Sequence, residues 1–178
     1  MRLSRTIHAI ELLDGPVVGP LDTRDHWRLE FTGDGFLYKM VRNLTGTFIV
    51  NQTAGRIMKN QTPDAHGERG SIVNIASICG IMGCIGAPAY SAAKAGIIGF
   101  TRAVSLELKD TGVRINCFGP GATDTPLWRV GKSEADVQKL LDAGYVYQPD
   151  EFSNVVVWLA SDFSAPLNGE FISRDLHR

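Results

Sequence analysis

Tyr90 and Lys94 stand four residues apart at the start of a helical pattern, thirteen and seventeen residues after Ser77. Residues four apart on a helix share one face. A phenol is a weak base at neutral pH, but an ammonium group one turn away favours the phenolate. A serine hydroxyl could hold a substrate carbonyl, so the three side chains suit proton transfer during carbonyl reduction or alcohol oxidation. The alternative is a surface tyrosine beside a solvated lysine.

A buried strand and a loop of small residues would position these groups. The run Ile72–Ile75 is apolar and β-branched, as in a parallel strand that is covered on both faces. Ser77 follows the carboxyl end of this strand, where open α/β sheets bind their ligands. A glycine-rich loop leads to Pro88, and a helix is predicted from Tyr90 to about Lys109 with Gly112 as its C-cap.

Three motifs resemble those of the short-chain dehydrogenase/reductase family. Asn74–Ser77 is similar to its strand-end motif, Tyr90-Ser-Ala-Ala-Lys94 to its active-site motif, and Pro120-Gly-Ala-Thr-Asp-Thr125 to its Pro-Gly-x-x-x-Thr loop. The resemblance implies NAD(P)-dependent oxidation of an alcohol or reduction of a carbonyl, on a small-molecule substrate. It also implies an α/β fold with a doubly wound parallel sheet.

The resemblance assigns a role to each site residue. Tyr90 would be the acid/base, Lys94 would assist it and bind the cofactor ribose, and Ser77 would orient the carbonyl. Asn43 opens a string, Asn-Leu-Thr-Gly-Thr-Phe, that resembles a helix of the family, and would hold a water of the proton relay. The loop expected against the nicotinamide of NAD or NADP contributes Pro120, Gly121, Thr123 and Thr125. No metal site is expected.

The N-terminal segment has a different character. Residues 5–13 and 26–31 alternate as strands, and an apolar stripe from Phe36 to Phe48 predicts a helix that could continue to Met58, with Asp34 as its N-cap. The string Gly35–Asn43 (GFLYKMVRN) resembles the C-terminal part of tRNA pseudouridine synthases, over roughly residues 4–47. An ordinary amphipathic helix is the alternative. The prediction is two units, residues 1–42 and 43–178, joined at a string that both families share.

Neither resemblance is complete. The pseudouridine synthase chemistry needs a catalytic Asp from a segment that this chain does not contain. Residues 1–60 hold eight Lys or Arg against six acids, which is weak for RNA binding. The glycine-rich turn that grips the cofactor pyrophosphate in the dehydrogenase family is not found before residue 71. The predicted fold is therefore an incomplete Rossmann-like sheet after a β-β-α segment, and the alternatives to an oxidoreductase are an RNA-binding remnant and a non-catalytic chimeric fragment.

Composition sets further bounds. The length of 178 residues is that of one ordinary domain. The contents of 44% hydrophobic and 21% charged residues are ordinary for a soluble globular protein. A net charge of -1 provides no excess of positive charge that would favour binding to nucleic acid or to a membrane surface. Three cysteines argue against a disulfide framework, and the start of the chain has no apolar signal region, so a cytoplasmic location is expected. One side of the Tyr90 helix carries small residues that would admit another helix, which in the resembled family forms a homo-oligomer contact: Ala92, Ala95, Gly96, Gly99 and Ala103.

The remaining pattern predicts elements that complete a sheet. A strand is expected over residues 113–117, a mixed helical segment over 127–143 and a helix from Pro149, which has acids in its first turn. Asn168-Gly169 predicts a turn, and a short last strand is expected over residues 170–173.

Overall fold

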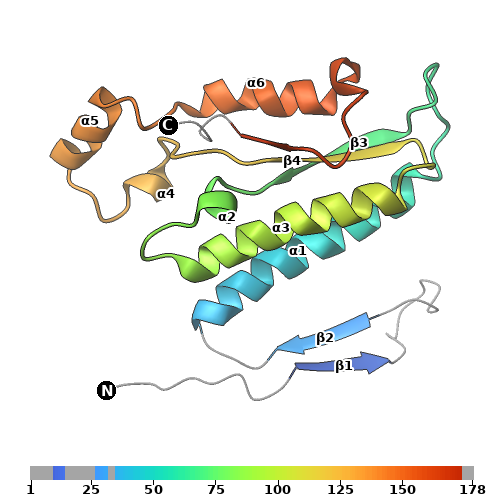
Figure 1. Cartoon of the computed structure of the whole chain (residues 1–178), viewed down its shortest axis with the longest axis horizontal. Coiled ribbons are helices and arrows are strands. Elements are labelled where there is room, and N and C mark those ends of the chain that lie inside the picture. Colours follow the sequence, from blue (N-terminus) through green and yellow to red (C-terminus); the bar gives the residue numbers. More distant parts are fainter. Residues whose placement is uncertain (1–9, 15–26, 32–34, 174–178) are drawn as a thin grey trace.

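The computed structural model describes residues 10–14, 27–31 and 35–173, which form two separate sheets (Figure 1). β1 (Ile10–Asp14) and β2 (Trp27–Phe31) pair antiparallel, with Ile10 opposite Phe31. β3 (Gly70–Ile75), β4 (Val113–Phe118) and β5 (Phe171–Ile172) form a parallel sheet in the order β3-β4-β5. The predicted α/β class is confirmed. Asp34 and residues 5–9 lie outside the described residues.

Helices cover both faces of the parallel sheet. α1 and α3 lie on one face and α6 on the other (Figure 1). Ile72, Val113 and Ile115 pack against side chains of α1 and α3, whereas Phe118 packs with Phe152 and Leu159 of α6. The helices are α1 (Gly35–Met58), α2 (Cys79–Met82), α3 (Pro88–Glu107), α4 (Pro126–Arg129), α5 (Glu134–Asp142) and α6 (Pro149–Ala160), followed by a 3₁₀ turn at Asp162–Ser164.

Most predicted elements are found, with one correction. α3 ends at Glu107 with Leu108 as its C-cap, so the prediction that Gly112 caps it is wrong. Gly112 instead has φ +75° in the turn before β4, and a Cβ there would lie 2.5 Å from the carbonyl oxygen of Gly67. The backbone at Gly67 occupies the space that a side chain at residue 112 would need, so only glycine fits at this turn.

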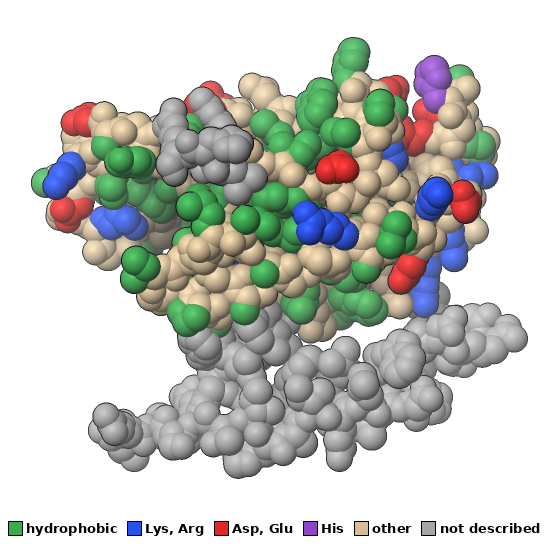
Figure 2. Space-filling model, in the orientation of Figure 1, with side chains coloured by type: hydrophobic (Ala, Val, Ile, Leu, Met, Phe, Trp, Pro, Cys, Tyr) green, Lys and Arg blue, Asp and Glu red, His purple; other side chains and the backbone are tan. Residues whose placement is uncertain are grey.

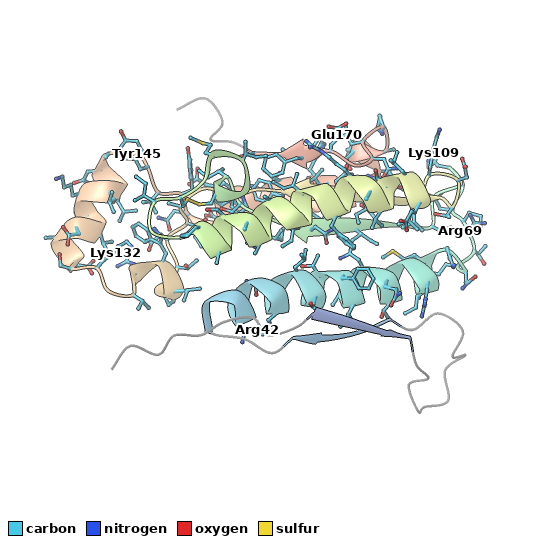
Figure 3. The ribbon with its side chains drawn as sticks, turned by 60° about the horizontal axis from the view of Figure 1, so that its bottom comes forward. Arg42, Arg69, Lys109, Lys132, Tyr145 and Glu170 are labelled. Carbon is cyan, nitrogen blue, oxygen red and sulfur yellow. A yellow bond between two sulfur atoms is a disulfide. The ribbon has the colours of Figure 1, made fainter. Side chains whose placement is uncertain are left out.

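α1 and α3 pack closely along their length (Figure 3). A Cβ on Gly96 would lie 3.3 Å from Leu44 Cδ2, and the rings of Phe48 and Phe100 are 5.7 Å apart. The small residue at position 96 thus admits another helix, as predicted, but this helix belongs to the same chain. The other four small residues of that side are exposed.

Buried polar side chains link these two helices to β3. Asn51 Nδ2 of α1 donates to Asn74 Oδ1 (2.8 Å), and Asn74 Nδ2 donates to Thr101 Oγ1 of α3 (2.9 Å). The Thr101 hydroxyl donates in turn to the carbonyl of Ile97 (2.8 Å). The side chains of Asn51, Asn74 and Thr101 are each at most 6% exposed. Buried polar groups need such partners, so the network fixes how α1 and α3 sit on the sheet.

Cys117 makes the stability of the fold sensitive to alkali. Its side chain is 1% exposed, and burial raises the pKa of its thiol from 9.0 to about 11. Between those values the folded chain keeps a proton that the unfolded chain loses, so stability is fully present below pH 9 and falls as the pH rises to 11. We expect a loss of about 2 to 3 kcal/mol over this range, by denaturant unfolding at a series of pH values. Cys117→Ala should lack this component, and equal slopes for the two proteins would contradict it.

Candidate active site

Ser77 lies where β3 and β4 end side by side. The ladder continues past β3 through the Ala76 N–H, which donates to the carbonyl of Phe118 (2.7 Å). Ser77 is 5% exposed, and its hydroxyl lies 3.5 Å from the carbonyl oxygen of Pro120 and accepts from the N–H of Cys79 (3.2 Å). The hydroxyl is therefore held at the carboxyl edge of the sheet, as the sequence predicts, with its direction set by two neighbouring backbone groups.

Tyr90 and Lys94 share one face of α3. Pro88 starts this helix, and the Tyr90 ring is 43% exposed. Lys94 Nζ lies 5.6 Å from the centre of the Tyr90 ring and donates to the carbonyl of Ile75 (2.9 Å), at the end of β3. Partial burial lowers the pKa of Lys94. The lysine thus brings a positive charge between the tyrosine and the strand that precedes Ser77.

The loop after β4 lies against the same edge. The Ile78 N–H donates to the carbonyl of Pro120 (3.3 Å), and the Thr123 hydroxyl donates to the carbonyl of Gly121 (3.2 Å). Thr123 also bridges to Tyr147, which precedes α6. Thr125 Oγ1 accepts from the Trp128 N–H (3.2 Å) and so caps α4.

An ion pair stiffens this loop from its far end. Arg129 of α4 forms two hydrogen bonds with the Asp124 carboxylate (2.6 and 2.8 Å), and they lower the pKa of Asp124. Asp124 lies between Thr123 and Thr125, two of the residues predicted to contact a nicotinamide. The pair therefore orders the segment on which both threonines stand.

Asn43 stands on a different element from the other predicted catalytic residues, on α1 rather than at the end of β3 or on α3. It is exposed on the first half of α1, and its carbonyl accepts from the Thr47 hydroxyl (3.0 Å). No hydrogen bond joins it to Ser77, Tyr90 or Lys94 within the described part of the chain. Its place in a proton relay stays a prediction.

A disulfide closes the loop between Ser77 and Tyr90. Cys79 and Cys84 are bonded across α2, with their Cα atoms 5.2 Å apart, and Cys117 stays free and buried. The cysteine count argued against a disulfide framework, but an odd count leaves one thiol over without excluding a single pair, and one pair is formed. α2 curls the chain by one turn, which brings two cysteines five positions apart into bonding distance. The N–H of Cys79 donates to the Ser77 hydroxyl, and the N–H of Cys84 donates to the Ser91 hydroxyl (3.0 Å). The disulfide therefore connects the segment that follows β3 with the start of α3.

Gly80 sets how closely this bridged loop approaches α3. A Cβ at residue 80 would lie 2.8 Å from the backbone N of Ala95 and the backbone carbon of Lys94. Backbone atoms cannot move aside as a flexible side chain can, so we expect Gly80→Ala to destabilise the chain by about 1 to 3 kcal/mol. The measurement is denaturant unfolding. Gly83→Ala is the comparison without steric contact, since nothing lies within 4 Å of its Cβ position, although its φ of +75° carries its own strain. An unchanged stability of Gly80→Ala would contradict the close packing.

The comparisons with known proteins identify the family. The profile described as enoyl-(acyl carrier protein) reductase matches residues 18–176. The chain belongs to the short-chain dehydrogenase/reductase family. It is 35% identical over 149 residues to human (3R)-3-hydroxyacyl-CoA dehydrogenase, covering 83% of this chain and 55% of that protein. It is 37% identical over 132 residues to the 3-oxoacyl-[acyl-carrier-protein] reductase FabG of Aquifex aeolicus, covering 73% of this chain and 51% of that protein.

A solved structure agrees in fold. The crystal structure of 3-hydroxyacyl-CoA dehydrogenase type-2 from Mycobacterium avium matches with a TM-score of 0.72 and 33% identity, over 81% of this chain and 56% of that one. The chain thus spans about half the length of the curated relatives it matches first. The family match crosses residue 43, and α1 is one continuous helix across it. The division into residues 1–42 and 43–178, and the likeness of residues 4–47 to pseudouridine synthases, stay predictions.

The residues present fit one end of a dinucleotide. Ser77 and Pro120 lie together at the carboxyl edge of β3 and β4. Lys94, which lies beside Tyr90, bonds Ile75 at the end of β3. Ligands of open α/β sheets bind at this edge. The sequence before residue 71 holds no Gly-x-x-x-Gly-x-Gly turn for the pyrophosphate. The donor set among the described residues therefore fits the reacting end of NAD(P).

Sequence reasoning missed several buried polar residues. Arg114, in the middle of the predicted strand, is only 8% exposed and Asn116 is fully buried. A charged residue inside an apolar run is itself a signal that a partner exists, but the identity of the partner is not encoded locally. Charged side chains of both signs are interspersed on the face drawn in Figure 2. No helix among the described residues is both long and apolar enough to cross a bilayer.

Proposed function

We propose that this chain supplies the proton-transfer half of an NAD(P)-dependent oxidoreductase that interconverts an alcohol and a carbonyl. The observation that carries the proposal is that Lys94, whose ammonium lies 5.6 Å from the centre of the Tyr90 ring, donates to the carbonyl of Ile75, two residues before Ser77. A bound NAD(P) would supply the hydride chemistry of this reaction. The names of the relatives suggest a 3-hydroxyacyl or 3-oxoacyl thioester as the substrate class.

Each side chain has one task in this proposal. Ser77 donates to the substrate oxygen and orients it toward Tyr90. The Tyr90 phenolate takes the hydroxyl proton of the alcohol, and the phenol returns it in the opposite direction. Lys94 places its positive charge beside the Tyr90 ring and would bind the ribose hydroxyls of the cofactor, while Asn43 holds a water that passes the proton on to solvent. Pro120, Gly121, Thr123 and Thr125 are the residues that would hold the nicotinamide.

A thermal melt with and without millimolar NADH and NADPH tests the proposal, followed by turnover of an acetoacetyl thioester. A ligand present at about 100 times its dissociation constant adds roughly 2.7 kcal/mol to the folded state. We expect the melting temperature to rise with one cofactor and the reduced cofactor to be consumed. A cooperative melt whose melting temperature changes with neither cofactor, together with no turnover, would refute an active site and support a non-catalytic fragment.

We propose in addition that the chain forms a homo-oligomer through α1 and α3. Ala92, Ala95, Gly99 and Ala103 on α3 are exposed, and so are Ile49, Val50 and Ile57 on α1, at 54%, 65% and 58%. Light scattering should give a mass above 19.4 kDa for the pure chain. Ala95→Glu, which places a charge on the exposed side of α3, should shift that mass to the monomer, and a monomeric unmodified chain would refute the proposal.

A further inference from the structure

The Cys79–Cys84 disulfide lies between two serine hydroxyls at the candidate site. The N–H of Cys79 donates to the Ser77 hydroxyl (3.2 Å), and the N–H of Cys84 donates to the Ser91 hydroxyl (3.0 Å). Ser91 stands on α3, and its hydroxyl donates to the carbonyl of Ala87, the N-cap residue of that helix (3.0 Å). The covalent bond therefore ties the backbone group that orients the Ser77 hydroxyl to the start of α3.

Noncovalent contacts give the bridged segment little stability of its own. α2 is a single turn of four residues, and none of these described residues is buried. A single turn is unstable by itself because its first hydrogen bond fixes several residues at once. The apolar side chains of Ile81, Met82 and Ile85 are all at least 50% exposed. Apart from the close approach of Gly80 to α3, the disulfide is thus the constraint that keeps the two bridged residues at their hydrogen-bond partners.

The three cysteines differ in how a reductant can reach them. Cys79 and Cys84 are only partly buried, and α2, which they enclose, lies beside the first half of α3 (Figure 1). Cys117 lies inside the sheet, 1% exposed, where burial raises the pKa of its thiol to about 11. Thiol–disulfide exchange needs a thiolate with an open path to a sulfur atom. The bridge meets this condition, whereas Cys117 does not and serves as an internal control.

We propose that Cys79 and Cys84 form a reversible redox site whose state controls the segment that carries Ser77. A thiolate of a small dithiol attacks one sulfur of the bridge and forms a mixed disulfide, which the second thiol of the same reductant resolves. The dithiol is oxidised to a cyclic disulfide and the bridge is reduced to two thiols, so two electrons and two protons pass to the protein.

Reduction frees the segment from its covalent constraint. The Cys79 N–H then no longer holds the Ser77 hydroxyl in one direction, and the hydroxyl turns away from the position that a substrate oxygen would need. The oxidised chain is therefore the competent form. This effect on turnover rests on the proposed function, whereas the structural change of the segment does not.

Amide hydrogen exchange by NMR tests the structural change on the full chain, before and after treatment with dithiothreitol. We expect the amide protons of Cys79 and Cys84 to exchange at least about tenfold faster after reduction. The amide of Cys117, which donates to the carbonyl of Glu170 (2.8 Å), should change little. Glutathione disulfide, which reoxidises the two thiols, should restore the original rates. N-ethylmaleimide should label Cys79 and Cys84 in the reduced folded chain and leave Cys117 unlabelled.

A matched pair of variants separates the bridge from the third cysteine. The double variant Cys79→Ser with Cys84→Ser should show the faster amide rates with or without dithiothreitol, whereas Cys117→Ala should keep the full response of the unmodified chain. Turnover of the unmodified chain should fall at least about tenfold on reduction, as a reacting group loses its position, and recover on reoxidation. If neither form turns over, the proposed function fails, and the amide rates alone decide the redox site.

Several results would overturn the redox site. Maleimide labelling of Cys79 and Cys84 before reduction would show that no bridge forms, and a bridge that dithiothreitol leaves intact would show that it is not reversible. Amide rates that do not change on reduction would show that the bridge does not hold the segment. A reduced chain without a cooperative melt would make the bridge a support of the whole fold, and equal turnover of two active forms would exclude its control of Ser77.

Discussion

Replacing Tyr90 by phenylalanine is expected to lower turnover by about 100- to 10,000-fold, the usual contribution of a positioned acid/base. The substitution removes one oxygen and keeps the ring. Lys94 Nζ, 5.6 Å from that ring, keeps its bond to the Ile75 carbonyl, so the site should stay assembled. The measurement is the initial rate of NADH or NADPH consumption at saturating cofactor and substrate, compared with the unmodified protein.

Tyr145→Phe is the matched control for this prediction. Tyr145 is 63% exposed beyond α5 and has no role in the proposed chemistry, so its loss of a hydroxyl should leave turnover unchanged. Cofactor binding gives the second readout, because Tyr90→Phe should retain most of the thermal shift that NADH or NADPH produces. A Tyr90→Phe protein that turns over at the normal rate would exclude Tyr90 as the acid/base.

Arg114→Met is expected to lower the free energy of unfolding by about 3 to 5 kcal/mol, as when one partner of a buried ion pair is removed. Arg114 pairs with Glu68, donates to the hydroxyl and carbonyl of Ser164 (3.0 and 3.1 Å) and donates to the carbonyl of Ser161 (3.1 Å). Methionine fills similar space without replacing any of these bonds. Denaturant unfolding, followed by circular dichroism, measures the change.

Two further variants test whether the loss of stability comes from the bonds that Arg114 makes. Arg102→Met, on an exposed position of α3, should change stability by no more than about 0.5 kcal/mol. The double variant Glu68→Gln with Arg114→Met should be less unstable than Arg114→Met alone, because it no longer leaves a carboxylate half-buried and unpaired. If Arg114→Met unfolds at the same denaturant concentration as the unmodified chain, Arg114 does not hold β4 to the segment after α6.

Local patterns in the sequence predicted the elements that carry the site. The apolar run before Ser77 forms β3, residues 113–117 lie within β4, and Pro149 begins α6 with Asp150 and Glu151 in its first turn. These patterns work because strand and helix periodicity depends on neighbours a few residues apart. The spacing of Tyr90 and Lys94 placed them on one helical face for the same reason.

Contacts between distant residues could not be predicted in this way. Arg114 bonds to Glu68 and Ser164, which are 46 and 50 residues away in the sequence, and Asn51 bonds to Asn74, which is 23 residues away. The Cys79–Cys84 bridge is close in sequence, but it depends on the single turn of α2, which no periodic pattern in so short a segment could indicate. The position of Asn43 depends likewise on how α1 packs, and the structure shows it exposed.

The sequence by itself thus determined the family motifs, the parallel strands and the residue types available for proton transfer, because each is encoded within a few residues of the chain. Only the tertiary structure decided that the Lys94 ammonium bonds the end of β3, that Gly96 admits α1 and that β4 lies between β3 and β5. These features arise when elements far apart in the chain meet, and their energies depend on the burial and the hydrogen-bond partners that the meeting creates.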